Sequence, residues 1–251
     1  MPRNFSGKSV LVTGSSSGIG LAIAKKFYQQ GYQVVINGRD PGRLQQAADQ
    51  LPGVFAILAD VTHPAEANRM VNEVLEKCGS LNLLICNVGS GSSVPPGSEN
   101  FDEWGRVFNL NFRSATNIIE SAKTALAETQ GAIVCISSIC GSEVVDNAPL
   151  TYSVAKAALN AYVRGAARPL AKYGIRINAV APGNILFQDS VWDFKLKNDA
   201  GEVLAHLKNM VPLNCFGTPD DVADLVLYLS SEKSKFVTGS IWRLDGGQGH
   251  L

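Results

Sequence analysis

The segment TYSVAK carries two side chains that could move a proton, Tyr152 and Lys156. Residues four apart lie on one face of a helix, so the phenol and the ammonium would be neighbours there. A phenol with a pKa of about 10 is a poor acid–base catalyst at neutral pH, but a nearby positive charge favours the phenolate and lowers that pKa. An isolated pair of this kind is more often a surface tyrosine packed on a lysine stem, so the surroundings must decide its role.

Two further polar residues could belong to the same site. Ser138 directly follows the apolar run 132–137, and a hydroxyl at a strand end can polarise a carbonyl as charge develops on its oxygen. The neighbouring Ser137 is the alternative. Asn111 lies inside a helical pattern, where it either bends the helix or takes part in the chemistry.

A glycine- and serine-rich run, VTGSSSGIG, occupies residues 12–20. Its glycines at positions 14, 18 and 20 do not follow the G-x-G-x-x-G spacing of the general dinucleotide fingerprint. Taken alone, the run is either a flexible linker or a loop whose backbone amides hold a phosphate.

Short apolar runs alternate with helical patterns along the chain and must position these residues. The runs are continuously apolar, as in a parallel sheet that is covered on both faces. Expected strands are 8–13, 33–37, 54–59, 81–86, 132–137, 176–181 and 240–244; expected helices are 19–30, 41–51, 64–78, 101–127, 151–173 and 219–231. We therefore expect an α/β fold: a single domain over residues 1–251, with a doubly wound (Rossmann) parallel sheet of about seven strands and helices on both faces.

This order of elements favours a phosphate-binding role for the run at 12–20. The run lies between a strand and a helix, where the helix N-terminus presents free amides and the positive end of its dipole. Gly14 would permit the turn, Gly18 a close approach to a pyrophosphate, and Gly20 close packing of helix and strand. The three serines, 15–17, could donate hydroxyl hydrogen bonds.

Composition excludes several classes of protein. Lys+Arg and Asp+Glu balance at 22 each, which removes the electrostatic footprint of a nucleic-acid binder. The five cysteines include no C-x-x-C pair, and the three histidines are too scattered for a metal site, so we expect reduced thiols and no metal. No signal-peptide core and no apolar run of about 18 residues occurs, so we expect a cytoplasmic protein without a membrane partner.

With these motifs in this order, nearly the whole chain resembles the short-chain dehydrogenase/reductase family. Among the members of this family, the 3-oxoacyl-acyl-carrier-protein reductases and related ketoreductases resemble the chain most in their overall pattern. The matching motifs are T-G-x-x-x-G-I-G at 13–20, C-N-V-G at 86–89 for the family's N-N-A-G, Asn111 after Trp104, Ser138, Y-x-x-x-K at 152–156, Pro182–Gly183, and LDGG at 244–247.

The resemblance implies a hydride transfer between a nicotinamide cofactor and a carbonyl or secondary alcohol. Tyr152 would transfer the proton, Lys156 would bind the nicotinamide ribose, and Ser138 would orient the substrate carbonyl. Asn111 would hold, through its main chain, a water in a proton relay to Lys156. The predicted catalytic residues are thus Asn111, Ser138, Tyr152 and Lys156, and the predicted cofactor-binding residues are Gly14, Ser16, Ser17, Gly18, Ile19, Gly20, Arg39, Asp60, Val61, Asn87, Gly89, Tyr152, Lys156, Pro182, Gly183 and Ile185.

The end of the second strand, NGRDPGR, bears on which nicotinamide is bound. Gly38 stands where an Asp would accept a hydrogen bond from a ribose 2′-hydroxyl, and Arg39 follows it. A guanidinium can grip a 2′-phosphate, so we predict NADP(H) rather than NAD(H). Asp40 could rotate inward against this, and Arg43 is a second candidate partner of the phosphate.

The stretch 184–217 is the one long irregular region. It carries Phe187 where the family often has a Thr that contacts the cofactor, and Gln188 or Ser190 could compensate. Its aromatic residues among polar ones indicate either a flexible substrate lid or a partly helical insertion. Its part 184–210, with the segments 90–94 and 140–145, would face the substrate.

The function expected is reduction of a ketone such as a 3-oxoacyl thioester. The alternative within enzymes is a sugar or polyol dehydrogenase, possibly NAD-linked, and the non-enzymatic alternative is a nucleotide-binding scaffold. Family members usually form tetramers through the helices that correspond to 101–127 and 151–173 and through the last strand, so a homotetramer is expected.

Overall fold

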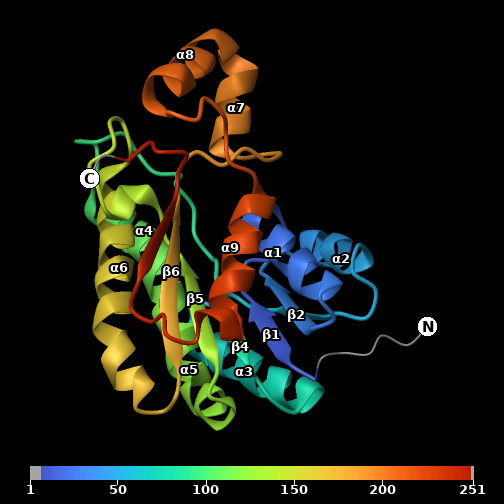
Figure 1. Cartoon of the computed structure of the whole chain (residues 1–251). Coiled ribbons are helices and arrows are strands. Elements are labelled where there is room, and N and C mark those ends of the chain that lie inside the picture. Colours follow the sequence, from blue (N-terminus) through green and yellow to red (C-terminus); the bar gives the residue numbers. More distant parts are fainter. Residues whose placement is uncertain (1–6, 250–251) are drawn as a thin grey trace.

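A computed structural model describes residues 7–249 of the chain, and its centre is one parallel sheet of seven strands. The strands lie in the order β3-β2-β1-β4-β5-β6-β7, which is the doubly wound arrangement expected from the sequence (Figure 1). Their bounds are β1 Ser9–Val12, β2 Gln33–Gly38, β3 Phe55–Leu58, β4 Leu83–Cys86, β5 Ala132–Ile136, β6 Arg176–Pro182 and β7 Ile241–Leu244.

Helices cover both faces of the sheet, and this explains why the strands are apolar throughout. Successive strand residues point to opposite faces, so Leu11 packs in one apolar core while Val10 and Val12 pack in the other. Helices α1 (Gly18–Gln29), α2 (Pro41–Asp49) and α9 (Pro219–Ser230) close one core, and α3 (Pro64–Cys78), α5 (Ser114–Thr129) and α6 (Leu150–Ala171) close the other.

The expected single helix over 101–127 is wrong in one respect. Helix α4 (Phe101–Phe108) passes into a π-helical turn at Asn109–Arg113 before α5 begins. Asn111 lies at the centre of this turn, and its side-chain Nδ2 donates to the Val107 carbonyl at 3.1 Å. Single π turns of this kind are frequent at functional sites.

The stretch 184–217 folds into two helices, α7 (Val191–Asn198) and α8 (Ala200–Met210), which project beyond the carboxyl ends of the strands (Figure 1). Two hydrogen bonds close its base, from the Leu186 amide to the Gly217 carbonyl (2.9 Å) and from the Gly217 amide to the Asn184 carbonyl (3.0 Å). Helix α7 buries none of its residues, and α8 buries Val203 and Leu207. Of the two interpretations of this stretch, the helical insertion describes its local structure.

Within residues 7–249, no helix is both long enough and apolar enough to cross a bilayer. The same residues contain no cluster of three or more His, Cys, Asp or Glu side chains suited to a metal ion.

Candidate active site

The glycine-rich loop after β1 is held in shape by its own chain. Gly14 and Gly18 have φ angles of +60° and +54°, which side chains with a Cβ rarely adopt. The Asn87 side-chain amide donates to the carbonyls of Thr13 (3.1 Å) and Gly14 (2.9 Å), and Asn37 Oδ1 accepts from the Gly14 amide (3.2 Å). The loop therefore presents a fixed row of backbone groups at the start of α1.

The N-terminus of α1 has no side-chain cap. Ser17 is the N-cap residue of this helix, and its side chain makes no capping hydrogen bond. Helix N-termini carry amides without intrahelical partners and a partial positive charge, which together suit a phosphate. The residues present thus fit the pyrophosphate of a dinucleotide.

The three serines of the loop differ in their roles. Ser15 is fully buried, and its hydroxyl donates to the Val12 carbonyl (2.7 Å) and accepts from the Asn37 amide (2.9 Å). The expectation that all three serines could donate to a ligand is therefore wrong for Ser15, which braces the loop instead. Ser16 is half-buried and Ser17 is exposed.

The ends of β2 and β3 place Arg39 and Asp60 side by side. The Arg39 guanidinium is 69% exposed and lies 3.8 Å from the Asp60 carboxylate. Burial alone would raise the pKa of Asp60, but hydrogen bonds from Thr62 and the charge of Arg39 outweigh it and hold that pKa below its usual value. Asp40 does not turn inward, because its carboxylate caps α2 by accepting from the Arg43 amide (2.8 Å).

Gly38 lies against the glycine loop, and this limits what residue could stand there. A Cβ at Gly38 would lie 3.1 Å from the Ser16 hydroxyl oxygen. A longer acidic side chain at this position would have to displace Ser16. With glycine and not an acidic residue at position 38, the space beside it is bordered by Ser16 and Arg39.

Two residues that sequence reasoning missed, Asn37 and Asn117, support the cofactor side of the site by bonding to the backbone around the end of β3. Asn37 bonds through Nδ2 to the carbonyls of Ile57 and Ala59, and Asn117 bonds to those of Val61 (3.1 Å) and Thr62 (3.0 Å). A buried polar residue in an otherwise apolar strand was the available signal for Asn37, since such a side chain must find partners.

Ser138, Tyr152 and Lys156 come together at the carboxyl end of β5. The Tyr152 and Ser138 side chains are hydrogen-bonded to each other, and the Lys156 ammonium lies 5.7 Å from the centre of the Tyr152 ring. Ser137 points away, because its hydroxyl donates to Asn160 at 2.6 Å in the core. Of the two serines, the structure thus places Ser138 beside the phenol.

Burial controls the protonation of this cluster. It raises the pKa of Tyr152 to about 12, against a lowering by the bond to Ser138, and it lowers the pKa of Lys156 to about 8. The Lys156 ammonium donates to the Ile136 carbonyl at 2.8 Å. Lys156 therefore does not offset the effect of burial on the phenol pKa here, and the expected lowering by an ammonium together with an oxidised nicotinamide stays a prediction.

Asn111 and Lys156 converge on the loop after β4. A Cβ at Gly89 would lie 2.8 Å from Asn111 Oδ1 and 3.0 Å from the Lys156 nitrogen, so only glycine fits without a shift. The Asn111 side chain is fully engaged, since it accepts from the Ser90 amide (2.9 Å) and donates to the Ser90 carbonyl (3.1 Å). Only its main chain remains for a water relay, which stays a prediction.

The cluster opens into a cleft of about 420 Å³ under the helical insertion. Ser138 and Tyr152 lie on one side of it, and Trp192 and His206 of α7 and α8 lie on the other. Trp192 stacks on His206 (5.5 Å between ring centres), which joins the two helices. Phe187, below them, lies with its ring against Gly18.

Of the remaining predicted cofactor residues, Gly183 lines this cleft, and Ile19 and Ile185 pack with the apolar core. Pro182 ends β6, and Gly183 donates its amide to the Leu244 carbonyl (2.9 Å). Ile185, which is buried, forms the bridge to Gly217 at the base of the insertion. Ile19 packs on the core under α1.

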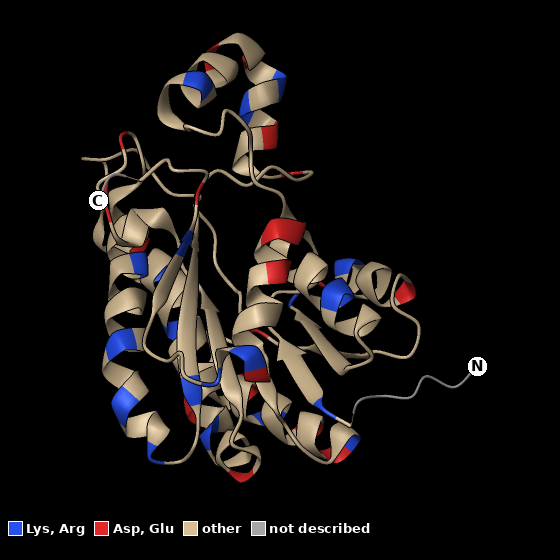
Figure 2. Cartoon of the chain, in the orientation of Figure 1, with Lys and Arg blue, Asp and Glu red and all other residues tan. Residues whose placement is uncertain are grey.

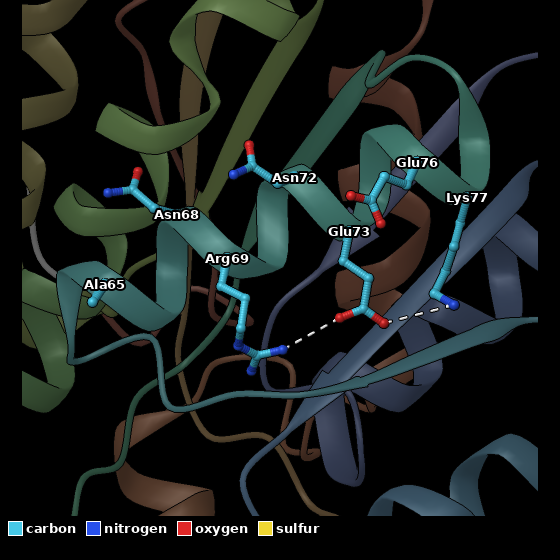
Figure 3. Close-up of a pocket in the computed structure, with 7 residues that line it drawn as sticks. All are labelled: Ala65, Asn68, Arg69, Asn72, Glu73, Glu76 and Lys77. Carbon is cyan, nitrogen blue, oxygen red and sulfur yellow. Dashed lines mark hydrogen bonds and ion pairs between the residues drawn. The ribbon is translucent and has the colours of Figure 1, made fainter.

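A second hollow, of about 740 Å³, lies on the outer face of α3 and has different properties (Figure 3). Its charges neutralise one another, because Arg69 and Lys77 both pair with Glu73, at 3.3 and 3.6 Å. Exposed pairs of this type belong to a solvated helix face. Elsewhere, Figure 2 shows basic residues along α6 and acidic residues at the start of α9, and neither sign covers the whole of this side.

The fold and the site together define a class of protein. A doubly wound sheet, an uncapped helix N-terminus after β1, and a Ser–Tyr–Lys cluster at the carboxyl end of β5 and in α6 define a nicotinamide-dependent oxidoreductase that acts on C=O and CH–OH groups.

Comparison with known proteins narrows this class. A family model described as enoyl-(acyl carrier protein) reductase matches residues 14–248. The 3-oxoacyl-[acyl-carrier-protein] reductase FabG of Staphylococcus aureus is 34% identical over 248 residues (96% of this chain, 97% of that one), and FabG of Thermotoga maritima is 32% identical over 247 residues (96% and 97%). A solved short-chain dehydrogenase/reductase of unknown function from Caenorhabditis elegans, with cofactor, has a TM-score of 0.88 at 30% identity and covers 98% of this chain and 96% of its own.

The chain belongs to the short-chain dehydrogenase/reductase family. The resemblance seen in the sequence, including its closeness to 3-oxoacyl reductases, is thereby confirmed.

Proposed function

We propose that this protein reduces a ketone to a secondary alcohol with NADPH, and that the ketone is a 3-oxoacyl thioester. The observation that carries the proposal is the Ser138–Tyr152–Lys156 cluster, of which Ser138 and Tyr152 line a cleft. The thioester is suggested by the FabG relatives, whose names state that substrate.

The proposed mechanism assigns one role to each side chain. Bound NADPH supplies the hydride that goes to the carbonyl carbon. The Ser138 hydroxyl donates to the carbonyl oxygen and holds it beside the phenol. Tyr152 gives its proton to that oxygen as negative charge develops there, and its pKa of about 12 keeps the proton available at neutral pH. Lys156 would bind the ribose hydroxyls, and the main chain of Asn111 would hold a water through which a solvent proton returns to Tyr152 by way of Lys156.

NADP(H) is favoured over NAD(H) by the space beside Gly38. An Arg39 side chain that is mostly exposed and the nearby Ser16 hydroxyl offer donors to a 2′-phosphate. No carboxylate stands at position 38 to receive a ribose 2′-hydroxyl. The remaining predicted cofactor residues would line the path from this phosphate to Tyr152.

A hydroxylated ketone, as in sugar and polyol dehydrogenases, is the second candidate substrate. It is favoured by polar side chains that line the cleft, among them Asn184, Lys195 and Gln248. A saturated acyl chain would leave such groups without partners.

Assembly as a cytoplasmic homotetramer is part of the proposal. Between α5 and α6 the outer face carries an apolar groove of about 780 Å³, lined by Ala127, Tyr162, Ala166 and Leu170. Exposed apolar surface of this kind is typical of subunit contacts. Light scattering should report a tetramer for the native chain and a smaller species for Ala166→Glu.

The function is tested by following NADPH oxidation with 3-oxoacyl thioesters, ketoses and small ketones in parallel. We expect turnover to be fastest with a 3-oxoacyl thioester and slower with NADH. If the chain oxidises NADPH with none of these ketones, and reduces NADP⁺ with none of the corresponding alcohols, the proposal is wrong.

A further inference from the structure

Among residues 7–249, two buried side-chain amides in the cleft each have one polar atom without a hydrogen-bond partner. These atoms are the Nδ2 donor of Asn184 and the Oε1 acceptor of Gln248, whose residues are 9% and 5% exposed. Nearly all buried polar groups in proteins are paired, so an unpaired donor and an unpaired acceptor in one cleft require an explanation. Both residues line the cavity that contains Ser138 and Tyr152.

Both side chains stand on backbone that is fixed by hydrogen bonds. The Asn184 carbonyl accepts from the Gly217 amide (3.0 Å), and the Gln248 amide donates to the Asp245 carbonyl (3.1 Å). The Gln248 side chain lies over Gly183, since a Cβ at Gly183 would be 3.0 Å from Gln248 Oε1. The unpaired acceptor is thus held next to the residue that precedes Asn184.

We infer that Asn184 and Gln248 determine specificity by binding one hydroxyl group of the substrate near the reacting carbonyl. The hydroxyl oxygen accepts from Asn184 Nδ2, and its hydrogen is donated to Gln248 Oε1. A hydroxyl satisfies both groups, a carbonyl or ether oxygen satisfies only the donor, and an alkyl chain satisfies neither. The inference rests on the proposed ketone reduction and favours its second candidate substrate, the hydroxylated ketone, because an unsubstituted 3-oxoacyl thioester would satisfy only the Asn184 donor.

The position of the pair favours substrate over cofactor as its ligand. The rest of the cavity wall comes from the insertion, through Trp192 and His206, and from the segment after Ser138, through Cys140 and Val145. No residue of the glycine loop, and neither Arg39 nor Asp60, lines this cavity. The cavity is therefore separate from the groove in which the adenosine half of a dinucleotide would lie.

The test compares two ketones that differ by one hydroxyl, a straight-chain 2-ketone and its 1-hydroxy counterpart, with NADPH. We expect native protein to prefer the hydroxyketone about tenfold or more in kcat/KM, because a site built around polar groups rejects a substrate that leaves them unpaired. Asn184→Leu and Gln248→Met keep size but remove the polar atoms, and each should bring the ratio close to one. Gln248→Glu keeps an acceptor and should retain most of the preference.

Two controls separate specificity from folding. Asn198→Leu changes an exposed amide on the wall of the same cleft and should leave the ratio unchanged. Each variant is also titrated with NADPH in the absence of ketone, and its affinity should match that of the native chain.

Three outcomes would overturn the inference. A ratio that neither variant changes would show that the pair does not contact the substrate. A loss of NADPH affinity with an unchanged ratio would assign the pair to the cofactor's carboxamide, which is also both donor and acceptor. Absence of NADPH oxidation with every ketone would overturn the proposed function itself and this inference with it.

Discussion

The two sides of the site use the same kind of residue in opposite ways. On the cofactor side, the amides of Asn37 and Asn87 are bonded to the backbone of the glycine loop and of neighbouring strands. On the substrate side, the amides of Asn184 and Gln248 contain groups with no partner. Polar side chains that are satisfied within the fold build a constant binding surface, whereas unsatisfied ones are available to a particular ligand.

The largest effect is expected at Tyr152, where the two sides meet. Tyr152→Phe removes the proton donor and should lower kcat by about 10²- to 10⁴-fold, while NADPH affinity stays the same. Steady-state assays measure kcat, and NADPH titration measures the affinity for the cofactor. Ser153→Ala is the control, because that hydroxyl donates to the Pro149 carbonyl outside the cluster. Turnover of Tyr152→Phe at the native rate would contradict the assignment.

The next effect should be confined to the cofactor side. Arg39→Asp replaces the donor for a 2′-phosphate by a like charge, and the preference for NADPH over NADH should fall about 100-fold. The ratio of kcat/KM for the two cofactors measures this. Arg43→Asp, in the first turn of α2, should change the ratio less. An unchanged ratio in Arg39→Asp would rule out NADP(H) selection by Arg39.

A smaller effect, about tenfold in NADPH affinity, is expected from Asn87→Ala. The substitution leaves the carbonyls of Thr13 and Gly14 without donors and should lower the free energy of unfolding by about 1–3 kcal/mol. Thermal melting and NADPH titration report the two changes. The kcat/KM ratio between the two ketones should stay unchanged. A change in that ratio would show that the cofactor side and the substrate side do not act independently.

The smallest effect is a pH dependence that comes from Lys156. Burial lowers its pKa to about 8, so the side chain is charged below that pH and neutral above it. NADPH affinity should therefore fall a few-fold as pH rises through about 8, because the ammonium attracts the anionic cofactor. Lys156→Arg stays charged and should remove this step; a step of equal size in that variant would assign it to another group.

The sequence could predict the sheet because its strands are buried on both faces and so read as continuous apolar runs. The order of motifs likewise led to the cluster of Ser138, Tyr152 and Lys156. The π-helical turn at Asn109–Arg113 was not predictable, since one added residue in a turn hardly disturbs helical spacing. Helix α7 was equally hidden, because a helix that buries nothing has no apolar stripe to detect.

The direction in which side chains point was the other feature that the sequence could not predict. Ser15, Ser16 and Ser17 are identical letters, and only the turn at Gly14 decides that the first of them faces the core. Similarly, burial raises the pKa of Tyr152, and the Lys156 ammonium bonds to the Ile136 carbonyl. Neither can be read from the spacing of the two residues.

The ring of Phe187 lies against Gly18, and so one side chain from the base of the insertion borders the loop proposed to bind the cofactor's phosphates. A dinucleotide that settles along the loop therefore meets a residue whose backbone amide is bonded to the Ser190 hydroxyl at the start of α7 (3.3 Å). In kinetic terms, this contact links occupancy of the loop to the position of the helices above the cleft. Such a link favours an ordered sequence, with cofactor bound first and ketone second.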